Sequence, residues 1–354
     1  MFETLGLDMD PRQAAIGLGL LIGLIFGGLA EVSRFCFRRM VAGPRGDRRS
    51  AAGVWFAGLA VAVIGTQIAI TQGIVSFEEH RFFAADLPWL AIILGGLAFG
   101  AGMVLTRGCV SRLTVLAGTG NMRALIVLLA FAFVAHATLK GVLAPVRTSL
   151  GSVTVAFENA ALPGNALIWS ALIVVAARLI VARSGATKRD ILLGALIGAL
   201  VPAAWIGTGF VLFDEFDPIA LESLSFTSPA AETLFWGIAS SSIPAGFGVG
   251  LMGGVLGGAL VLSLIFGRFQ WQSFETPRQT GRYLAGAALM GVGGVLAGGC
   301  TMGAGLSGIP TLSVAAILAV VSIAIGGTLM ARILRDGVSS TGAGQTTQGP
   351  VPAE

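Results

Sequence analysis

The residues of this sequence best suited to chemistry are three cysteines, Cys36, Cys109 and Cys300. A thiol is a weak hydrogen-bond donor, and its thiolate is a nucleophile or a metal ligand. The odd count and the wide spacing give neither a CxxC redox or zinc motif nor a disulfide framework. No metal-ligand set, nucleotide-binding loop or hydrolytic triad accompanies them. We therefore expect no cofactor, no metal and no catalytic residue, and a protein that is not an enzyme.

Two of the cysteines close similar glycine-rich stretches. Residues 100–109 read GAGMVLTRGC and residues 291–300 read GVGGVLAGGC, with six of ten positions identical. Glycine allows positive φ and close approach of a ligand to the backbone. A helix that starts after such a turn points free N–H groups at the site, which suits an anion. The alternative is that the glycines are packing contacts and the cysteines small buried apolar groups. The supporting residues of these loops are Arg107, Gly108, Gly298 and Gly299.

Cys36 lies in a different setting, the segment SRFCFRR at 33–39. Its counterpart in the second half is Val211, so the repeat does not support it. The neighbouring arginines could activate the thiol or only anchor a helix end in the membrane interface. Glu31 and Arg34 are three residues apart on a predicted helix and could pair. Ionisable residues inside a membrane segment are nevertheless functional candidates.

The composition indicates the class of protein that holds these residues in place. Of 354 residues, 55% are apolar, 11% are charged and 52 are glycine, which is too few charges for a water-facing surface of this size. The apolar residues fall in blocks long enough to cross a bilayer. We predict an all-α polytopic membrane protein with nine such blocks: 14–37, 51–73, 88–106, 123–143, 164–183, 190–212, 246–266, 282–297 and 312–334. The eighth is short and could cross only half of the membrane, and a weaker stretch near 234–245 could dip without crossing.

The charges of the loops predict the orientation. Basic residues gather in alternate loops, as cytoplasmic loops require: Arg38, Arg39, Arg45, Arg48 and Arg49; Arg178, Arg183, Lys188 and Arg189; Arg268, Arg278 and Arg282; Arg332 and Arg335. The opposite loops hold only four basic residues, Arg12, Arg81, Lys140 and Arg147, and carry the acids Glu78, Glu79, Asp86, Asp214, Glu215, Asp217, Glu222 and Glu232. The net charge of +4 therefore reflects topology and not a nucleic-acid partner. We expect a multi-pass protein of the bacterial inner membrane with a periplasmic N-terminus and a cytoplasmic C-terminus.

The two glycine-cysteine stretches indicate an internal repeat. Block one runs inward while its partner, block six, runs outward, and blocks three and eight are opposed in the same way. Inverted repeats of this kind place a substrate site near the midplane, on broken helices that face each other. We predict a periplasmic N-terminus at 1–13, membrane repeats at 14–185 and 186–335, and a disordered tail at 336–354, which is rich in Gly, Ser, Thr, Gln and Pro.

On three segments the sequence resembles the YeeE/YedE family, whose members include thiosulfate-uptake permeases. These segments are RFCF at 34–37, GMVLTRGC at 102–109 and VLAGGC at 295–300, within a pattern that extends over 14–335. The resemblance implies re-entrant segments, an hourglass-shaped interior and a path lined by Cys36, Cys109 and Cys300. Some members are linked to selenium metabolism. Arg107 stands where many thiosulfate permeases have another glycine.

The function expected is therefore uptake of thiosulfate or a related small sulfur anion through the bilayer. Thiol S–H groups would hand the anion from site to site without holding it firmly, and helix ends and arginines would attract it. A small cytoplasmic sulfur-carrier protein is a candidate partner. The alternatives are a selenium-compound transporter of the same fold, a membrane thiol oxidoreductase, and a structural membrane subunit whose cysteines only pack.

Overall fold

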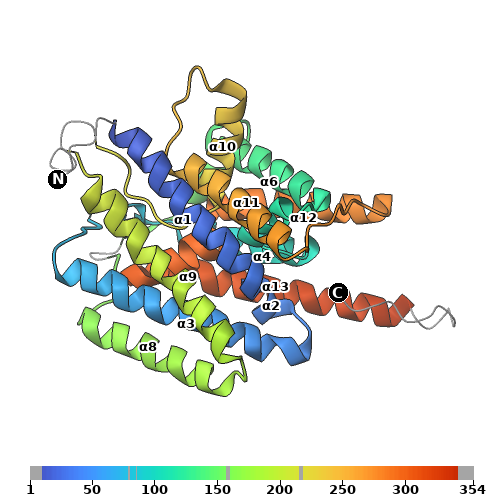
Figure 1. Cartoon of the computed structure of the whole chain (residues 1–354), viewed down its shortest axis with the longest axis horizontal. Helices are drawn as coiled ribbons and strands as arrows, with labels where there is room; N and C mark the ends of the chain where they lie inside the picture. Colours follow the sequence, from blue (N-terminus) through green and yellow to red (C-terminus); the bar gives the residue numbers. More distant parts are fainter. Residues whose placement is uncertain (1–9, 79, 85, 157–159, 215–217, 342–354) are drawn as a thin grey trace.

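The fold is a bundle of membrane-length helices (Figure 1). The structure is a computed structural model that describes residues 10–78, 80–84, 86–156, 160–214 and 218–341. Its α-helices are α1 (Pro11–Ser33), α2 (Phe37–Ala42), α3 (Arg45–Thr71), α4 (Trp89–Leu105), α5 (Val110–Gly118), α6 (Met122–Lys140), α7 (Ala144–Gly151), α8 (Ala166–Arg183), α9 (Lys188–Ile206), α10 (Thr227–Ala239), α11 (Phe247–Ile265), α12 (Pro277–Leu296) and α13 (Val314–Thr341).

Short elements complete the chain. The 3₁₀ turns are η2 (Arg81–Phe83) and η5 (Ile309–Thr311), and the π-helical segments are η3 (Gly207–Val211) and η4 (Thr301–Gly308). The strands β1 (Asp86–Leu87) and β2 (Val155–Ala156) form one antiparallel pair.

The prediction of nine membrane spans is confirmed over the described residues. The helical stretches that are long and apolar enough to cross are 11–42, 45–71, 89–118, 122–140, 166–183, 188–211, 247–265, 277–311 and 314–335. The eighth block is longer than the sequence indicates, because α12 is followed by a break and by η4. The stretch near 234–245 comprises the end of α10 and the turn that follows it. Residues 336–341 continue α13 where a disordered tail is predicted; the predicted segments 1–9 and 342–354 lie outside the described residues.

The odd number of spans places the start of α1 and the end of α13 on opposite faces (Figure 1). We name these the N-terminal face and the C-terminal face. Helix starts agree with local sequence. Asn121 caps α6 by accepting from Ala124 N at 3.1 Å, and Thr276 caps α12 by accepting from Gln279 N at 3.3 Å.

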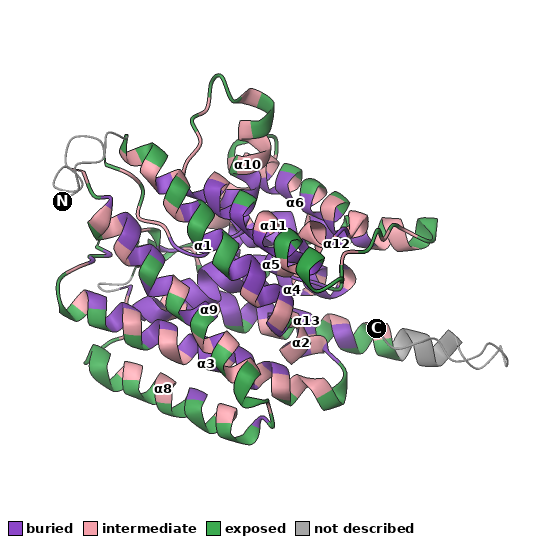
Figure 2. Cartoon of the chain, in the orientation of Figure 1, coloured by how far each residue is buried: buried purple, intermediate pink, exposed green. Residues whose placement is uncertain are grey.

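Packing in the bundle depends on small residues. Helices α1 and α11 pack against each other along glycine rows, where a Cβ on Gly23 or Gly254 would overlap the backbone of the opposite helix. Close backbone approach of this kind drives helix association in lipid. Figure 2 shows buried residues gathered where α1, α4, α9 and α11 meet, whereas α8 is exposed along most of its length. Most exposed side chains of α8 are apolar, including Leu167, Ile168 and Leu172, as a lipid-facing helix requires.

The helix pairs follow the predicted repeat. α1 packs on α11 and α9 packs on α3; α4 packs on α13 and α12 packs on α6; and α4 packs on α12. Exchanging α1, α3, α4 and α6 with α9, α11, α12 and α13 reproduces the same set of contacts. This is the packing expected of two repeats related by a pseudo-twofold axis between α4 and α12.

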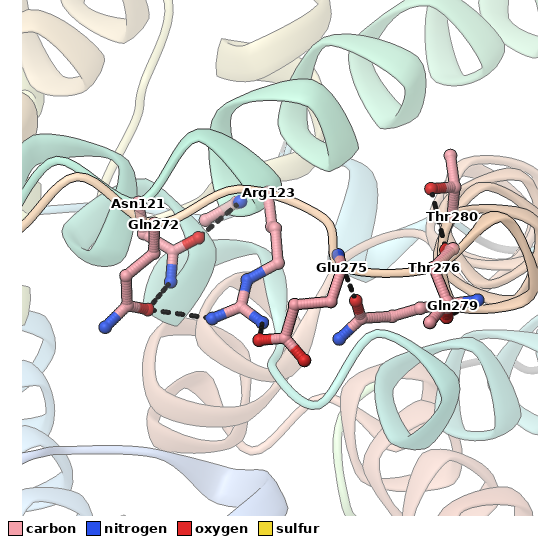
Figure 3. Close-up of polar contacts among 8 residues, drawn as sticks. Asn121, Arg123, Gln272, Glu275, Thr276, Gln279 and Thr280 are labelled. Atoms are coloured by element: carbon pink, nitrogen blue, oxygen red, sulfur yellow. Dashed lines mark hydrogen bonds and ion pairs between the residues drawn. The ribbon is translucent and has the colours of Figure 1, made fainter.

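Polar contacts tie the two halves together near the start of α6 (Figure 3). Gln272 Oε1 accepts from Asn121 Nδ2 and from Arg123 Nη2, both at 2.9 Å, and Met122 N donates to Gln272 O at 2.8 Å. Arg123 Nη1 also lies 3.6 Å from Glu275 Oε1. The loop that follows α5 is thereby fixed to the loop that precedes α12.

Candidate functional site

Each of the three cysteines is the N-cap of a helix that starts after a break. Cys36 precedes α2, Cys109 precedes α5 and Cys300 precedes η4. The residue two positions earlier has a left-handed backbone in every case: φ is 52° at Arg34, 59° at Arg107 and 71° at Gly298. The chain therefore builds the same turn three times, once with glycine and twice with arginine.

This shared turn is the feature that sequence reasoning missed at Cys36. The repeat argument finds no counterpart for Cys36 and treats it separately. The available signal is the spacing Arg-x-Cys at 34–36, which recurs at 107–109. A non-glycine residue at positive φ is uncommon and is often found at functional sites.

Hydrogen bonds hold the turn before Cys109. The hydroxyl of Thr106 lies 3.0 Å from Gly102 O and 2.9 Å from Gly108 O, so it bridges the end of α4 and the residue before the cysteine. Thr106 is buried and Arg107 is exposed. The turn therefore presents a guanidinium to solvent and keeps the thiol inside.

Cys36 and Cys109 come together. Their side chains lie within hydrogen-bonding reach of each other, and Cys109 Sγ is 3.2 Å from Ser111 Oγ. Both are free thiols and are buried, with 7% and 1% of their surfaces exposed. Arg38 and Arg112 are close enough to interact electrostatically with Cys36. The site thus holds two thiols and two cations near the C-terminal face.

Glu31 belongs to the same region but pairs differently from the sequence expectation. Its carboxylate lies 3.9 Å from Arg112 Nη1 and 3.7 Å from Arg268 Nη1. Arg112 Nη1 also donates to Ala30 O at 3.1 Å. No ion pair joins Glu31 to Arg34 among the described residues, because α1 ends at Ser33 and the left-handed turn at Arg34 breaks the helical spacing that pairing requires. Glu31 therefore anchors α1 to α5.

Cys300 lies apart from the other two thiols. A Cβ on Gly95 would be 2.5 Å from Ala297 N, and a Cβ on Gly286 would be 2.7 Å from Thr106 Cγ2. The break after α12 is thus beside the first half of α4, at Gly95, and the break after α4 is beside the middle of α12, at Gly286. Because an α-helix rises by a fixed distance per residue, the stretch of α4 from Gly95 to Thr106 places the two breaks roughly 16 Å apart along the helix axis. The expectation that the glycine-cysteine turns face each other is wrong, because the antiparallel helices overlap along their length before they break.

A cavity of about 820 Å³ opens on the N-terminal face next to Cys300. Gly303 and Ser307 of η4 form part of its wall, and Gly303 N donates to Cys300 Sγ at 3.5 Å. The three cysteines are not among its lining residues, and only 1% of the Cys300 surface is exposed. The thiol therefore lies directly behind the cavity wall, one helical turn before the residue that lines it.

An extended segment, residues 218–226, crosses this cavity; we call it the strap. Thr208 Oγ1 donates to Glu222 O at 2.8 Å and accepts from Glu222 N at 3.1 Å. Ser223 Oγ donates to Val201 O at 3.0 Å, and Ser307 Oγ donates to Leu224 O at 2.8 Å. Ser225 Oγ is buried beside Gly303 and has no hydrogen-bond partner among the described residues. The strap is fixed to α9 and η4 and leaves one hydroxyl unused.

The cavity contains charges of both signs. Arg81, Glu222 and Glu232 line it, together with Glu78 and His80. Burial, followed by the charge of Glu232, raises the pKa of Glu222 to about 7, and burial lowers the pKa of His80 to about 4. Burial also raises the pKa of Glu232 and lowers that of Arg81, although a guanidinium remains cationic at neutral pH. Sequence reasoning uses Arg81 and the three carboxylates only as loop charges and does not bring them together.

Over the described residues, no group of three or more His, Cys, Asp or Glu side chains is arranged to hold a metal. The arrangement of the described residues consists of a cavity with one cation and three carboxylates, a thiol behind its wall, and a thiol pair with arginines near the opposite face. Such an arrangement can attract an anion and offer it soft donors at two depths.

Comparison with known proteins gives consistent matches. A family model described as sulphur transport matches residues 32–329. The thiosulfate transporter TsuA of Spirochaeta thermophila is 27% identical over 334 residues, covering 90% of this chain and 99% of the relative. The thiosulfate transporter TsuA of Escherichia coli K12 is 25% identical over 314 residues, covering 81% of this chain and 86% of the relative.

Proposed function

The chain belongs to the sulphur transport family, the YeeE/YedE family that its sequence resembles, and on that premise we propose that it takes up thiosulfate or a closely related sulfur anion. The names of the two TsuA relatives support this substrate class. The observation that carries the proposal is the distribution of thiols and charge. Cys300 lies behind the cavity wall of the N-terminal face, and Cys36 and Cys109 lie together near the C-terminal face.

The proposal includes the orientation of the chain in the bacterial inner membrane. The C-terminal face carries the arginine-rich connections, such as Arg45, Arg48 and Arg49 at the start of α3. Positively charged loops remain in the cytoplasm, so the C-terminal face is cytoplasmic and the cavity is periplasmic. Uptake then begins at the cavity and ends at the thiol pair.

Transfer along the path is by hydrogen bonding to thiols. A desolvated anion inside a membrane is costly unless partial charges replace its water. Cys300 meets the anion first, and Cys109 and Cys36 receive it on the cytoplasmic side, where Arg38 and Arg112 balance its charge. Weak donors allow release as well as binding, which conduction requires. The chain acts in this scheme as a transporter and not as an enzyme.

The same face supports delivery to a protein partner. Arg34 and Arg107 are exposed beside the turns that carry Cys36 and Cys109. We include in the proposal a small cytoplasmic sulfur-carrier protein that receives the anion there. Copurification of such a protein, lost when both arginines are replaced by glutamate, is the expected result. Unchanged copurification would exclude this docking surface.

A second candidate function, thiol oxidation in the membrane, is favoured by one observation, the contact of Cys36 with Cys109. A thiol oxidoreductase would cycle this pair between dithiol and disulfide. Mass spectrometry of protein from thiosulfate-grown cells separates the two functions. A relay predicts free thiols throughout, whereas redox cycling predicts a Cys36–Cys109 disulfide that appears with turnover.

The experiment that tests the proposal is uptake in a host without its own carriers. Thiosulfate, sulfite and selenium oxyanions are supplied separately, and wild type is compared with Cys109→Ala at matched protein levels. We expect uptake of thiosulfate by wild type and its loss in the variant. Uptake of a selenium oxyanion but not of thiosulfate would reassign the substrate. Full uptake by Cys109→Ala would leave the cysteines only a packing role.

A further inference from the structure

Among the described residues, the periplasmic cavity is lined by one cation and three carboxylates, and the cation, Arg81, interacts electrostatically with two of them, Glu222 and Glu232, without contact. Arg81 projects from η2, Glu222 lies on the strap and Glu232 lies on α10. Within the described part of the chain, no ion pair joins any of the three to an opposite charge. Arg81 and Glu232 keep exposed surface within the cavity, although the surrounding protein displaces part of the water around their charged groups.

The two carboxylates are held in place by their surroundings. The backbone of Glu222 makes two hydrogen bonds with the Thr208 hydroxyl, so its side chain remains on the wall next to α9. Glu232 Oε2 lies against α11, 3.2 Å from the position that a Cβ on Gly248 would take. Arg81 packs with its guanidinium 5.3 Å from the Phe82 ring centre. The three charges therefore share one compartment in a fixed arrangement.

An anion that enters this compartment meets a net negative charge when both carboxylates are ionised. Protonation of one of these carboxylates reduces the negative charge beside Arg81, so that Arg81 attracts the anion more strongly. Linkage makes the effect reciprocal: an anion that binds more tightly when the carboxylate is protonated must also tighten proton binding. Burial and the nearby Glu232 raise the pKa of Glu222 to about 7, so its proton is exchangeable at neutral pH.

Other titratable groups do not supply this proton. On the loop before η2, His80 has a pKa lowered to about 4 by burial and is neutral near pH 7, and Glu78 is exposed. Lys140 on α6 acts on Glu232. The lining residues contributed by α9, η3 and η4 are uncharged. Glu222 is the half-buried carboxylate of the described cavity lining, whereas Glu78 and Glu232 are exposed, and we therefore assign the proton to Glu222.

We propose that Glu222 is the proton-coupling site of this transporter, and that one proton binds at its carboxylate when an anion is captured beside Arg81 and enters with it. This inference rests on the proposed function and supplies the driving ion for it. Each charge moved against a potential of 100 mV costs about 2.3 kcal/mol. A proton that accompanies a dianion reduces the net charge moved by one.

Calorimetric titration of the purified full-length protein with thiosulfate at pH 8, in two buffers of different ionisation enthalpy, tests this inference. At pH 8 Glu222 is about nine-tenths ionised, one unit above its pKa. We therefore expect uptake of about one proton per thiosulfate by wild type. Glu222→Gln, which mimics the protonated form, should take up none and bind about tenfold more tightly at this pH. Asp86→Asn, which replaces an exposed carboxylate of β1 outside the cavity lining, is the matched control and should behave as wild type.

The outcomes separate the two claims. Thiosulfate binding by wild type without proton uptake, or unchanged proton uptake by Glu222→Gln, would overturn the proton-coupling site and leave the transport proposal standing. No thiosulfate binding by wild type would overturn the proposed function and this inference with it. If Glu222→Gln does not fold, the pH dependence of the wild-type dissociation constant for thiosulfate tests the coupling instead. It should rise about tenfold per unit above pH 7, and a constant affinity from pH 6 to 9 would contradict coupling.

Discussion

Replacement of Cys300 separates its structural role from its role in transport. The side chain caps η4 by accepting from Gly303 N at 3.5 Å, and it is 1% exposed. Cys300→Ala removes the cap, which costs about 1 kcal/mol, and a buried atom worth about 0.8 kcal/mol. Cys300→Ser keeps an acceptor at the cap. We therefore expect the free energy of unfolding to fall by about 2 kcal/mol in the alanine variant and by less than about 1 kcal/mol in the serine variant.

The uptake rates of Cys300→Ala and Cys300→Ser should not follow their stabilities. A serine hydroxyl is a harder donor than a thiol and does not match a soft sulfur anion. Both variants should lose uptake at least about tenfold, equivalent to about 1.4 kcal/mol of barrier. Thr276→Ala is the matched control, because it removes a cap of the same kind from α12. It should lose about 1 kcal/mol of stability and retain uptake.

The assays are thermal unfolding of purified protein in detergent and uptake per molecule in vesicles. The expected pattern is a melting temperature a few degrees lower for Cys300→Ala, a nearly unchanged one for Cys300→Ser, and low uptake for both. Wild-type uptake by the serine variant would refute the argument, since capping geometry rather than the sulfur atom would then be what transport needs.

Three further perturbations have definite expectations. Gly198→Ala places a Cβ into the backbone carbonyl of Gly58, so it should destabilise by about 3 kcal/mol and abolish folded protein in size-exclusion chromatography. Gly298→Ala has open space but a φ of 71°, and it should cost about 1–2 kcal/mol in thermal unfolding, whereas Arg107→Gly should not destabilise. Arg81→Gln should raise the KM for thiosulfate about tenfold with little change in maximal rate; an unchanged KM would remove Arg81 from anion capture.

The membrane spans could be predicted from the sequence because bilayer thickness fixes their length. Nine apolar blocks correspond to nine helical stretches, with boundaries that differ by a few residues except where a break follows. Blocks three and eight are the exceptions. The turns at Cys109 and Cys300 separate α5 and η4 from the preceding helices, and hydropathy alone does not locate the end of a short helix inside the membrane.

The candidate site could be predicted only in part. The thiols of Cys109 and Cys300 follow from their glycine-rich turns, but the alignment of repeats does not reveal how far α4 and α12 overlap. The turn at Cys36 was missed because no glycine-rich stretch precedes it and the repeat aligns Cys36 with Val211. Arginine holds the left-handed position both at residue 34 and at residue 107, so a search for glycine at that position finds neither turn.

The cavity could not be predicted because its parts are distant in sequence. The strap has no hydrophobic periodicity, and its position depends on hydrogen bonds to Thr208 and Ser307. Arg81 and Glu222 meet only when the loop after α3 and the strap close over η4. In the sequence these residues look like ordinary charges of loops on one side of the membrane.

Passage of the anion along the cysteines is tested most directly by radiolabelled thiosulfate entering vesicles that contain the purified protein. We expect saturable accumulation by wild type, and none above protein-free vesicles for Cys109→Ala inserted in equal amount. Equal accumulation by wild type and Cys109→Ala would contradict a path that runs past these thiols.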